Sequence, residues 1–537
     1  MFQGYYKYFC LIFALAVLSC AKRGTINGGL KDTLAPVLRN ANPKNYATDF
    51  KGNTIKLTFD EYVKLKNVNK QLIVSPPMEK APEITPQVAS KYLNVKINDT
   101  LLPNTTYSLN FGQSIEDNNE GNPYRQFKYV FSTGSYIDSL SLSGSIKDAY
   151  TKKTDNFVSV MLYEVDDQYT DSIVYKKNPR YVTNTLDSAT VFKLENLKAG
   201  KYLLVALQDQ NSNYKFDPKN EKIGFRKAFV TVPNDSLFEI ALFRQQSKFK
   251  AFKPSQSSGN SAFLGYNGDP KDVKVKLRKG NVDLRVAATK VPKKDSLQIW
   301  FKPPSIEKNK VDSLAIEVRK GDYSENFVLK IKNQKKDTLN LKPIQGSVLA
   351  LGEKYILGSG IPLIGFDPSK MKLTNKDSIA VKFNTEYDEP NMELRFDFVR
   401  EELQKYKLEL FPGAVTDFME TPNDTLVYRF ETKNASDYGN LKLTLENVRQ
   451  YPIIVELTDK NENVQYSYYS ENSTEIDFTL IKPDTYTIRV IYDDNKNRQW
   501  DPGDFLLKRQ SEEVIYFPKE IDVRANWDVV QPINLKP

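Results

Sequence analysis

The chain contains no histidine and only two cysteines among its 537 residues. Without histidine, it lacks the commonest general base, the commonest metal ligand and the Ser-His and Cys-His nucleophile pairs. Cys10 lies inside a hydrophobic N-terminal segment and Cys20 lies directly after it, so we expect no disulfides. Zinc, copper and haem sites are not expected either, and we predict that the chain is not an enzyme.

One hydrophobic run stands out, at residues 8–19, between Lys7 and Cys20. The run is too short to span a bilayer stably, but it has the length of a signal-peptide core. Val17-Leu18-Ser19-Cys20 resembles a lipobox, at which lipoprotein signal peptides are cut and the cysteine is acylated. The resemblance implies that residues 1–19 are a lipoprotein signal peptide and that Cys20 carries the lipid. The alternative is an ordinary secretory signal or a short N-terminal anchor.

The expected lipid anchor predicts an outer membrane lipoprotein of the cell envelope. Ala21 follows Cys20, so the inner-membrane retention that an aspartate signals at this position is not expected. No acidic run follows the cysteine, as it does in some surface-exported lipoproteins, and we favour the periplasmic side over the cell surface. Residues 20–34 are polar and glycine-rich, which is typical of a flexible tether.

The net charge of +9 results from 76 basic and 67 acidic residues that are interspersed along the chain. Without a focused basic patch, binding to nucleic acid is not expected. The expected partners are the membrane, through the lipid, and an envelope protein or glycan whose identity the sequence does not give.

Alternation of apolar and polar residues, which is typical of half-buried strands, recurs along the chain, whereas helical periodicity is nearly absent. Residues 55–59, 273–277 and 441–445 are examples. We therefore predict an all-β fold, a multi-domain string of β-sandwiches. The predicted parts after the tether are a sandwich at 35–134, a sandwich at 135–244, a linker at 245–261, a sandwich at 262–345, a β-rich domain at 346–433 and a sandwich at 434–537.

The domain at residues 35–134 contains four motifs in a fixed order. They lie at residues 36–63, 102–107, 115–122 and 127–133. The order resembles the bacterial Ig-like domain of S-layer-type surface proteins. The resemblance implies an Ig-like sandwich that serves as a spacer or interaction module and has no catalytic residues.

The domains at 135–244 and 434–537 resemble each other. Residues 192–209 align with residues 478–493, so that Tyr202 and Tyr486 each stand seven residues before an aspartate. Both segments resemble the transthyretin-like sandwich of carboxypeptidase-regulatory-like repeats, and the resemblance implies that fold for both domains. As a whole, the chain resembles Ig-like lipoproteins of Bacteroidota.

An acidic loop follows each of these tyrosine strands, with side-chain oxygens at positions 1, 3, 5 and 9. This is the spacing of calcium-binding EF-hand loops, in which position 7 supplies a backbone carbonyl. The candidate ligands are Asp209, Asn211, Asn213, Lys215 and Asp217 in the first loop, and Asp493, Asn495, Asn497, Gln499, Asp501 and Asp504 in the second. Position 6, normally glycine, is Tyr214 or Arg498, and only the second loop has an acid at position 12. The alternative is a pair of turns that side chain-to-backbone hydrogen bonds hold without an ion.

These features together predict a non-catalytic envelope lipoprotein that acts as a structural spacer or as a protein- or glycan-binding module. No cofactor is expected apart from calcium in the two loops. The main alternative is a carbohydrate-binding accessory lipoprotein, which would need a cluster of exposed aromatic side chains. A hydrolase that uses two carboxylates would need a cleft that holds both acids about 5–10 Å apart.

Overall fold

The structure, a computed structural model, describes residues 32–185, 190–303 and 311–536. Cys20, the predicted signal peptide and most of the predicted tether lie outside these residues. Apart from strands, the described part has only short helical elements, namely α2 (Val68–Gln71), α3 (Ile173–Lys176), η1 (Pro368–Lys370) and η2 (Ala435–Asp437). None of the described helices is long and apolar enough to span a membrane. The chain divides into two compact units, one up to Leu140 with Glu195–Lys198 and one with the remainder.

The first unit is built around one β-sandwich. Its strands are β1 (Leu38–Asn42), β2 (Thr54–Leu65), β3 (Ile73–Ser75), β4 (Glu83–Thr85), β5 (Ser90–Lys96), β6 (Thr106–Asn110), β7 (Ile115–Asp117) and β8 (Lys128–Ser132). One sheet has the order β1-β2-β5-β4, with β7 paired to β2, and the other has the order β3-β6-β8. Alternate residues of β2, such as Ile55 and Leu57, are fully buried between the sheets, as the period of two requires.

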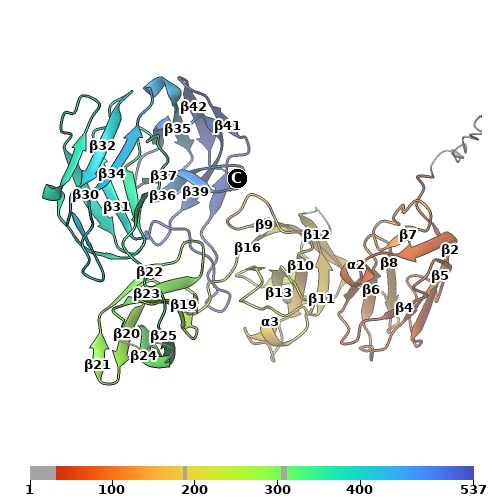
Figure 1. The fold of residues 1–537 in the computed structure, drawn as a ribbon. Coiled ribbons are helices and arrows are strands. Elements are labelled where there is room, and N and C mark those ends of the chain that lie inside the picture. Colours follow the sequence, from red (N-terminus) through yellow and green to blue (C-terminus); the bar gives the residue numbers. More distant parts are fainter. Residues whose placement is uncertain (1–31, 186–189, 304–310, 537) are drawn as a thin grey trace, which may run out of the picture. The chain divides into compact units, whose positions relative to one another are not determined.

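The second unit begins with a sandwich that we call the second sandwich. Its strands are β9 (Leu140–Asp148), β10 (Ser159–Glu164), β11 (Tyr181–Asn184), β12 (Val191–Leu197), β13 (Gly200–Leu207), β14 (Ile223–Phe225), β15 (Val230–Val232) and β16 (Leu237–Leu242). The sheets have the orders β12-β9-β16 and β11-β10-β13-β14, and β15 also pairs with β13 (Figure 1). Strands β9 and β16 are parallel, whereas the paired strands of the other sheet are antiparallel.

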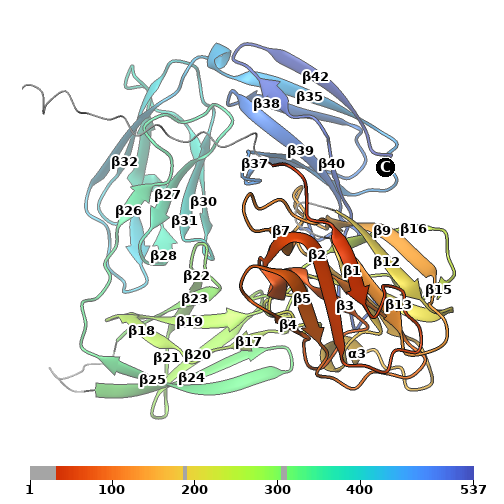
Figure 2. The same ribbon diagram turned by 90° about the vertical axis from the view of Figure 1, so that its right-hand side faces the viewer.

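The fifth sandwich, at the C-terminal end, repeats this topology strand for strand. Its strands are β35 (Gly439–Glu446), β36 (Ile453–Thr458), β37 (Val464–Ser470), β38 (Glu475–Ile481), β39 (Asp484–Tyr492), β40 (Val514–Tyr516), β41 (Ile521–Val523) and β42 (Asp528–Asn534). The orders are β38-β35-β42 and β37-β36-β39-β40, with β41 paired to β39 and with β42 parallel to β35. Figure 2 shows the two sheets stacked on each other. The similarity between residues 192–209 and 478–493 therefore reflects a shared architecture.

The third and fourth sandwiches lie between these two in the sequence. The third has β17 (Lys250–Ala251), β18 (Ser255–Ser258), β19 (Ser261–Asn267), β20 (Lys274–Lys279), β21 (Val282–Leu284), β22 (Val286–Lys290), β23 (Ser296–Phe301), β24 (Val311–Lys320) and β25 (Tyr323–Lys332). Its sheets have the orders β17-β19-β23-β22, with β18 on β19, and β21-β20-β24-β25. Thirteen buried hydrophobic residues, including Leu264 and Ile316, form its core.

The fourth sandwich has three sheets. Its strands are β26 (Leu341–Pro343), β27 (Tyr355–Ser359), β28 (Leu363–Phe366), β29 (Met371–Thr374), β30 (Phe383–Asp388), β31 (Glu393–Phe398), β32 (Lys405–Leu410), β33 (Val415–Asp417) and β34 (Leu426–Glu431). They are arranged as β26-β27-β31-β30, β29-β32-β34 and the pair β28-β33. Because β26 pairs with β27, this sandwich already includes Leu341, and the predicted boundary at residue 345 is too late.

The linker predicted at residues 245–261 is wrong for most of its length. Strands β17 and β18 fall within it, and both pair with β19. Ser258, Asn260 and Ser261, within this segment, are buried and hydrogen-bonded. The Asn260 side chain donates to the Asp337 carbonyl over 3.0 Å, and the Ser261 hydroxyl donates to the Asp337 carboxylate over 3.1 Å. The predicted fold class, an all-β string of sandwiches, is confirmed by the sheets of both units.

Candidate functional site

The two acidic loops occupy equivalent places in the second and fifth sandwiches. The first acidic loop, residues 209–217, follows β13, and the second acidic loop, residues 493–501, follows β39. Each of these strands lies inside its sheet and is largely buried, so each loop starts from a fixed position. The topology of the repeat, rather than the loop sequence alone, therefore places the two candidate sites in corresponding positions.

Side-chain oxygens hold the first acidic loop by binding its own backbone. The Asp209 carboxylate accepts hydrogen bonds from the backbone N–H groups of Asn213, over 3.2 Å, and Tyr214, over 2.8 Å. Asn211 accepts from the N–H of Asn213, and Asn213 accepts from that of Lys215. Tyr214, where EF-hand loops have glycine, adopts a left-handed φ of 56°. The bonds that Asn211 and Asn213 accept are Asx turns, whereas Asp209 accepts from N–H groups four and five residues further on. This is the arrangement expected of the alternative without an ion.

The second acidic loop repeats each of these bonds. The Asp493 carboxylate accepts from the N–H groups of Asn497, over 3.1 Å, and Arg498, over 2.8 Å. Asn495 accepts from the N–H of Asn497, and Asn497 accepts from that of Gln499. Arg498 has a φ of 66°, which matches the conformation at Tyr214. Equal spacing in the two sequences therefore corresponds to equal backbone geometry.

The predicted ligands at the ends of the loops differ between the copies. Asp217 accepts from the Lys219 N–H over 3.0 Å and from the Asn220 side chain over 2.9 Å. Asp501 accepts 2.6 Å hydrogen bonds from the side-chain amides of both Asn495 and Asn497. Asp504, the predicted twelfth position, instead accepts from the Leu507 N–H over 3.0 Å and closes a separate turn.

A buried glutamate that is not among the predicted ligands supports each loop. Glu221 accepts hydrogen bonds from the N–H groups of loop positions 2 and 9, which are Gln210, over 3.1 Å, and Asp217, over 2.9 Å. Glu512 accepts from the same two positions of the second loop, Asp494 over 2.8 Å and Asp501 over 2.9 Å. The two glutamates differ in their distance along the sequence from their loops, so spacing alone gives no signal for the pair.

Both glutamates are nearly inaccessible to solvent, with exposed fractions of 1% for Glu221 and 6% for Glu512. Burial raises the pKa of each carboxyl, and neighbouring loop aspartates raise it further, while the donated backbone N–H groups oppose these effects.

The described residues contain no group of three or more histidine, cysteine, aspartate or glutamate side chains arranged to hold a metal ion. In the second acidic loop, the amide nitrogens of Asn495 and Asn497 face Asp501, so both amides would have to turn their oxygens inward to bind a cation. The observed side-chain positions are those of a hydrogen-bonded turn. Calcium would fit the loop once the amides of Asn495 and Asn497 had turned. Calcium at the predicted residues therefore stays a prediction.

The segment after the second acidic loop, residues 502–511, docks on the second sandwich, and we call it the docking segment. The Phe505 side chain is fully buried, and its ring lies 5.1 Å from that of Phe225 in an edge-to-face contact. The Phe505 N–H donates to the Gln245 side chain over 3.1 Å, and the Gln510 side chain donates to the Phe225 carbonyl over 2.9 Å. The segment thus fixes the fifth sandwich to the second within this unit.

Arg489, in the middle of β39, carries the polar part of the same interface. Its side chain is only 1% exposed and donates to Glu456 over 2.5 Å and to the Tyr150 hydroxyl over 2.6 Å. The guanidinium carbon also lies 4.2 Å from the centre of the Tyr150 ring. Tyr516 completes the arrangement, because its hydroxyl donates to the Tyr150 carbonyl over 2.7 Å. A buried cation inside an apolar strand is tolerated here because a different sandwich supplies one of its partners.

Sequence comparison identifies one family within the chain. Residues 32–133 match the family of the bacterial Ig-like domain. The matched residues span β1–β8, so the resemblance predicted for residues 35–134 is confirmed for that domain. No curated protein matches the chain.

Similar solved structures are found at low identity. Domains 1–6 of the surface layer protein SbsC are 11% identical, covering 91% of this chain and 67% of that one, with a TM-score of 0.14. An I-band fragment of titin is 11% identical, covering 53% of this chain and 98% of that one, with a TM-score of 0.12. Salmonella alpha-2-macroglobulin is 11% identical, covering 90% of this chain and 42% of that one, with a TM-score of 0.14.

Proposed function

We propose that this chain is a non-catalytic lipoprotein of the outer membrane, anchored through Cys20 and facing the periplasm. Its β-sandwiches act as a structural spacer or as a protein- or glycan-binding module. The observation that carries this proposal is the interface between the second and fifth sandwiches, which buries Phe505 and Arg489. Such an interface stiffens a chain of small domains, and a spacer needs that property.

The chemistry of the loops supports a structural role over a catalytic one. Their carboxylates bind backbone N–H groups within their own turns, so these carboxylates are used to hold the chain. The absence of histidine from the sequence also removes the commonest general base. The bacterial Ig-like family of residues 32–133 fits a protein of this kind.

We also propose a transthyretin-like fold for the second and fifth sandwiches, and a Bacteroidota source for the chain. The equal strand orders and the parallel pairs β9-β16 and β42-β35 support a common fold for the two copies. In each copy, calcium is the proposed ligand of the acidic loop, because the loop has oxygen side chains at EF-hand spacing.

Glycan binding is the second candidate function, and two exposed tyrosines of the first sandwich favour it. Tyr62 on β2 is 56% exposed and Tyr92 on β5 is 42% exposed. A lysine lies beside each ring, with Lys91 Nζ 5.6 Å from the centre of Tyr62 and Lys56 Nζ 4.8 Å from that of Tyr92. Exposed aromatic faces beside cations suit a polar, anionic polymer. Replacing both tyrosines by alanine should abolish retention on an envelope-glycan column if this surface is used.

A pull-down from labelled envelope tests the main proposal. The bait is the mature wild-type chain, compared with Gly503→Ala and Gly352→Ala variants. A Cβ at Gly503 would overlap the Phe243 ring and the Arg509 carbonyl, which must displace the docking segment, whereas a Cβ at Gly352 would meet nothing within 4 Å. We expect an envelope protein or glycan that wild type and Gly352→Ala retain and that Gly503→Ala retains less. Recovery of no envelope component by wild type, or turnover of one, would contradict the proposal.

A further inference from the structure

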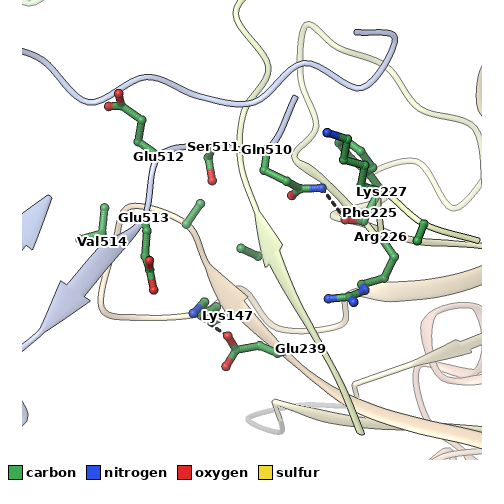
Figure 3. Close-up of a pocket in the computed structure, with 13 residues that line it drawn as sticks. Lys147, Phe225, Arg226, Lys227, Glu239, Gln510, Ser511, Glu512, Glu513 and Val514 are labelled. Carbon is green, nitrogen blue, oxygen red and sulfur yellow. Dashed lines mark hydrogen bonds and ion pairs between the residues drawn. The ribbon is translucent and has the colours of Figure 1, made fainter. Parts of the chain in front are cut away.

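A pocket of about 540 Å³ lies beside the docking segment, between the second and fifth sandwiches of the second unit (Figure 3). Its floor is the outer face of β9 and β16, where Lys147, Glu239 and Ala241 lie, together with Ala149 directly after β9. One wall is the connection from β14 to β15, at residues 225–228, and the opposite wall is residues 510–514, which lead into β40. Four separate stretches of the sequence therefore form the pocket.

Small side chains and one hydrogen bond keep this pocket open. Ala149, Ala228 and Ala241 leave the space between the walls unfilled. The hydrogen bond from the Gln510 side chain to the Phe225 carbonyl, 2.9 Å long, joins the two walls at one side, as Figure 3 shows. A hollow of this size is in the range that small-molecule ligands occupy.

The acidic residues that line the pocket all have partners in the described structure. Glu239 forms a 2.5 Å ion pair with Lys147, and Glu513 forms a 2.6 Å ion pair with Arg449. Glu512 accepts the backbone N–H groups of the second acidic loop. None of these carboxylates is therefore available to neutralise a further cation in the pocket.

Two cations of the pocket have no such partner. Among the described residues, no carboxylate lies within ion-pair distance of Arg226 or Lys227, although both line the pocket. The backbone of Arg226 is fixed, because its N–H donates to the Leu204 carbonyl over 3.1 Å. The guanidinium carbon lies 5.7 Å from the centre of the Phe238 ring on β16. The pocket thus contains two cations that no carboxylate of the described residues neutralises.

We propose that this pocket binds a small ligand that carries a carboxylate or phosphate group, with Arg226 as the main contact. The planar guanidinium donates two parallel hydrogen bonds to such groups, and Lys227 adds charge on the same wall. The Lys147–Glu239 pair on the floor offers a donor and an acceptor to the neutral part of the ligand. This site is additional to the proposed spacer role, since it needs neither the lipid anchor nor an envelope partner.

Binding of two probes to the full mature chain tests the proposal. Inorganic phosphate and glucuronate represent the two anionic groups, and glucose serves as the neutral control in isothermal titration calorimetry at constant ionic strength. The variant Arg226→Gln/Lys227→Gln removes the two unpaired cations. The matched control Lys372→Gln/Arg429→Gln removes the same charge from exposed positions of the fourth sandwich.

We expect one bound anion per chain, no binding of glucose, and affinity at least about tenfold lower in Arg226→Gln/Lys227→Gln than in the control variant. The stronger probe identifies the group that the pocket prefers. Thermal melting of each variant shows that the fold is retained. Failure of both anions to bind at tens of millimolar would overturn the proposal, as would an equal loss in the two double variants, since general charge would then explain the binding. Neither result would affect the proposed spacer or binding role, which the pull-down from labelled envelope tests separately.

Discussion

Replacing Arg489 by methionine removes the one charge that neutralises Glu456 inside the fifth sandwich. The Glu456 side chain is 12% exposed, so its carboxylate would be left largely desolvated without a counter-charge. Breaking a buried pair in this way costs about 3–5 kcal/mol. The matched control is Arg524→Met in the same sandwich, whose side chain is 62% exposed and pairs with Asp522 at 2.7 Å. Loss of such a surface pair costs about 0–1 kcal/mol.

Hydrogen exchange measured by mass spectrometry on the full chain reads out this difference. A chain of several sandwiches does not unfold in one transition, so the opening free energy of β39 must be measured locally. We expect faster exchange in β39 for Arg489→Met and little change for Arg524→Met. Equal, small effects of the two substitutions would refute the reasoning, because the guanidinium would then not be a buried, paired charge.

Hydrogen exchange also measures how much the second sandwich, through Tyr150, contributes to the stability of β39. Tyr150→Phe keeps the ring over Arg489 but removes the hydroxyl that accepts its hydrogen bond, at an expected cost of about 1.5–3 kcal/mol. In the Arg489→Met background the same change should cost less than about 0.5 kcal/mol, because the donor is already gone. Additive costs would show that the tyrosine hydroxyl is not coupled to the guanidinium.

Three further predictions concern the anchor, the ion and the buried acid. Cys20→Ala should release the protein from the membrane fraction or block its processing, and an unchanged mass and partition would refute acylation. Calcium at 10 mM should raise the local opening free energy of each loop-bearing sandwich by about 1.4 kcal/mol if the dissociation constant is about 1 mM. Asp493→Ala/Asp501→Ala should lose this gain in the fifth sandwich, and equal hydrogen exchange in calcium and in chelator would leave the loops as turns. Because burial raises the pKa of Glu512, its folded state binds a proton more tightly than its unfolded state, so its contribution to stability should fall as pH rises from the ordinary glutamate range through the raised value. Glu512→Gln should remove that slope in pH-dependent melting and cost about 1–3 kcal/mol at neutral pH, because one amide hydrogen-bond donor then faces a backbone N–H; an unchanged slope would count against the assignment.

The strands could be predicted from the sequence because the alternation of apolar and polar residues is a local pattern. Residues 55–59 fall within β2, and residues 441–445 fall within β35. In both segments every second side chain enters a core, and that alternation is visible over a few residues. The acidic loops could be predicted for the same reason, since each of their side chain-to-backbone hydrogen bonds links residues that are two to five positions apart.

The interface between the second and fifth sandwiches could not be predicted from the sequence, because the residues that form it are far apart in the chain. Arg489 and Tyr150 are 339 residues apart, and nothing near either residue indicates the other. In the sequence Arg489 is one polar position between Ile488 and Val490, which would ordinarily point to solvent. Such a position is buried only if a second domain covers that face of the sheet. The alternation of polar and apolar residues along one strand does not show whether another domain does so.

The failed linker at residues 245–261 has a different cause. A polar composition predicts a loop because polar side chains need hydrogen-bond partners, and for most polar segments these partners are water molecules at the surface. Here the serines, Asn260 and Asp337 satisfy one another, so a polar segment becomes part of a sandwich. The partner, Asp337, is 77 residues from Asn260, which again places the deciding contact outside any local window.

Comparison of the two copies shows which part of the connection between β39 and β40 serves the interface. In the second sandwich, β14 begins at Ile223, six residues after Asp217, whereas in the fifth sandwich β40 begins at Val514, thirteen residues after Asp501. The shared part of the two loops contains the Asx turns, and each loop binds a buried glutamate at the same two backbone positions. The added length is the docking segment, which supplies Phe505 and Gln510. The turns and the docking segment are successive, separate parts of the chain. Equivalent substitutions in the shared turns should therefore affect the second and fifth sandwiches alike. A substitution in the docking segment should instead weaken only the contact between the fifth sandwich and the second.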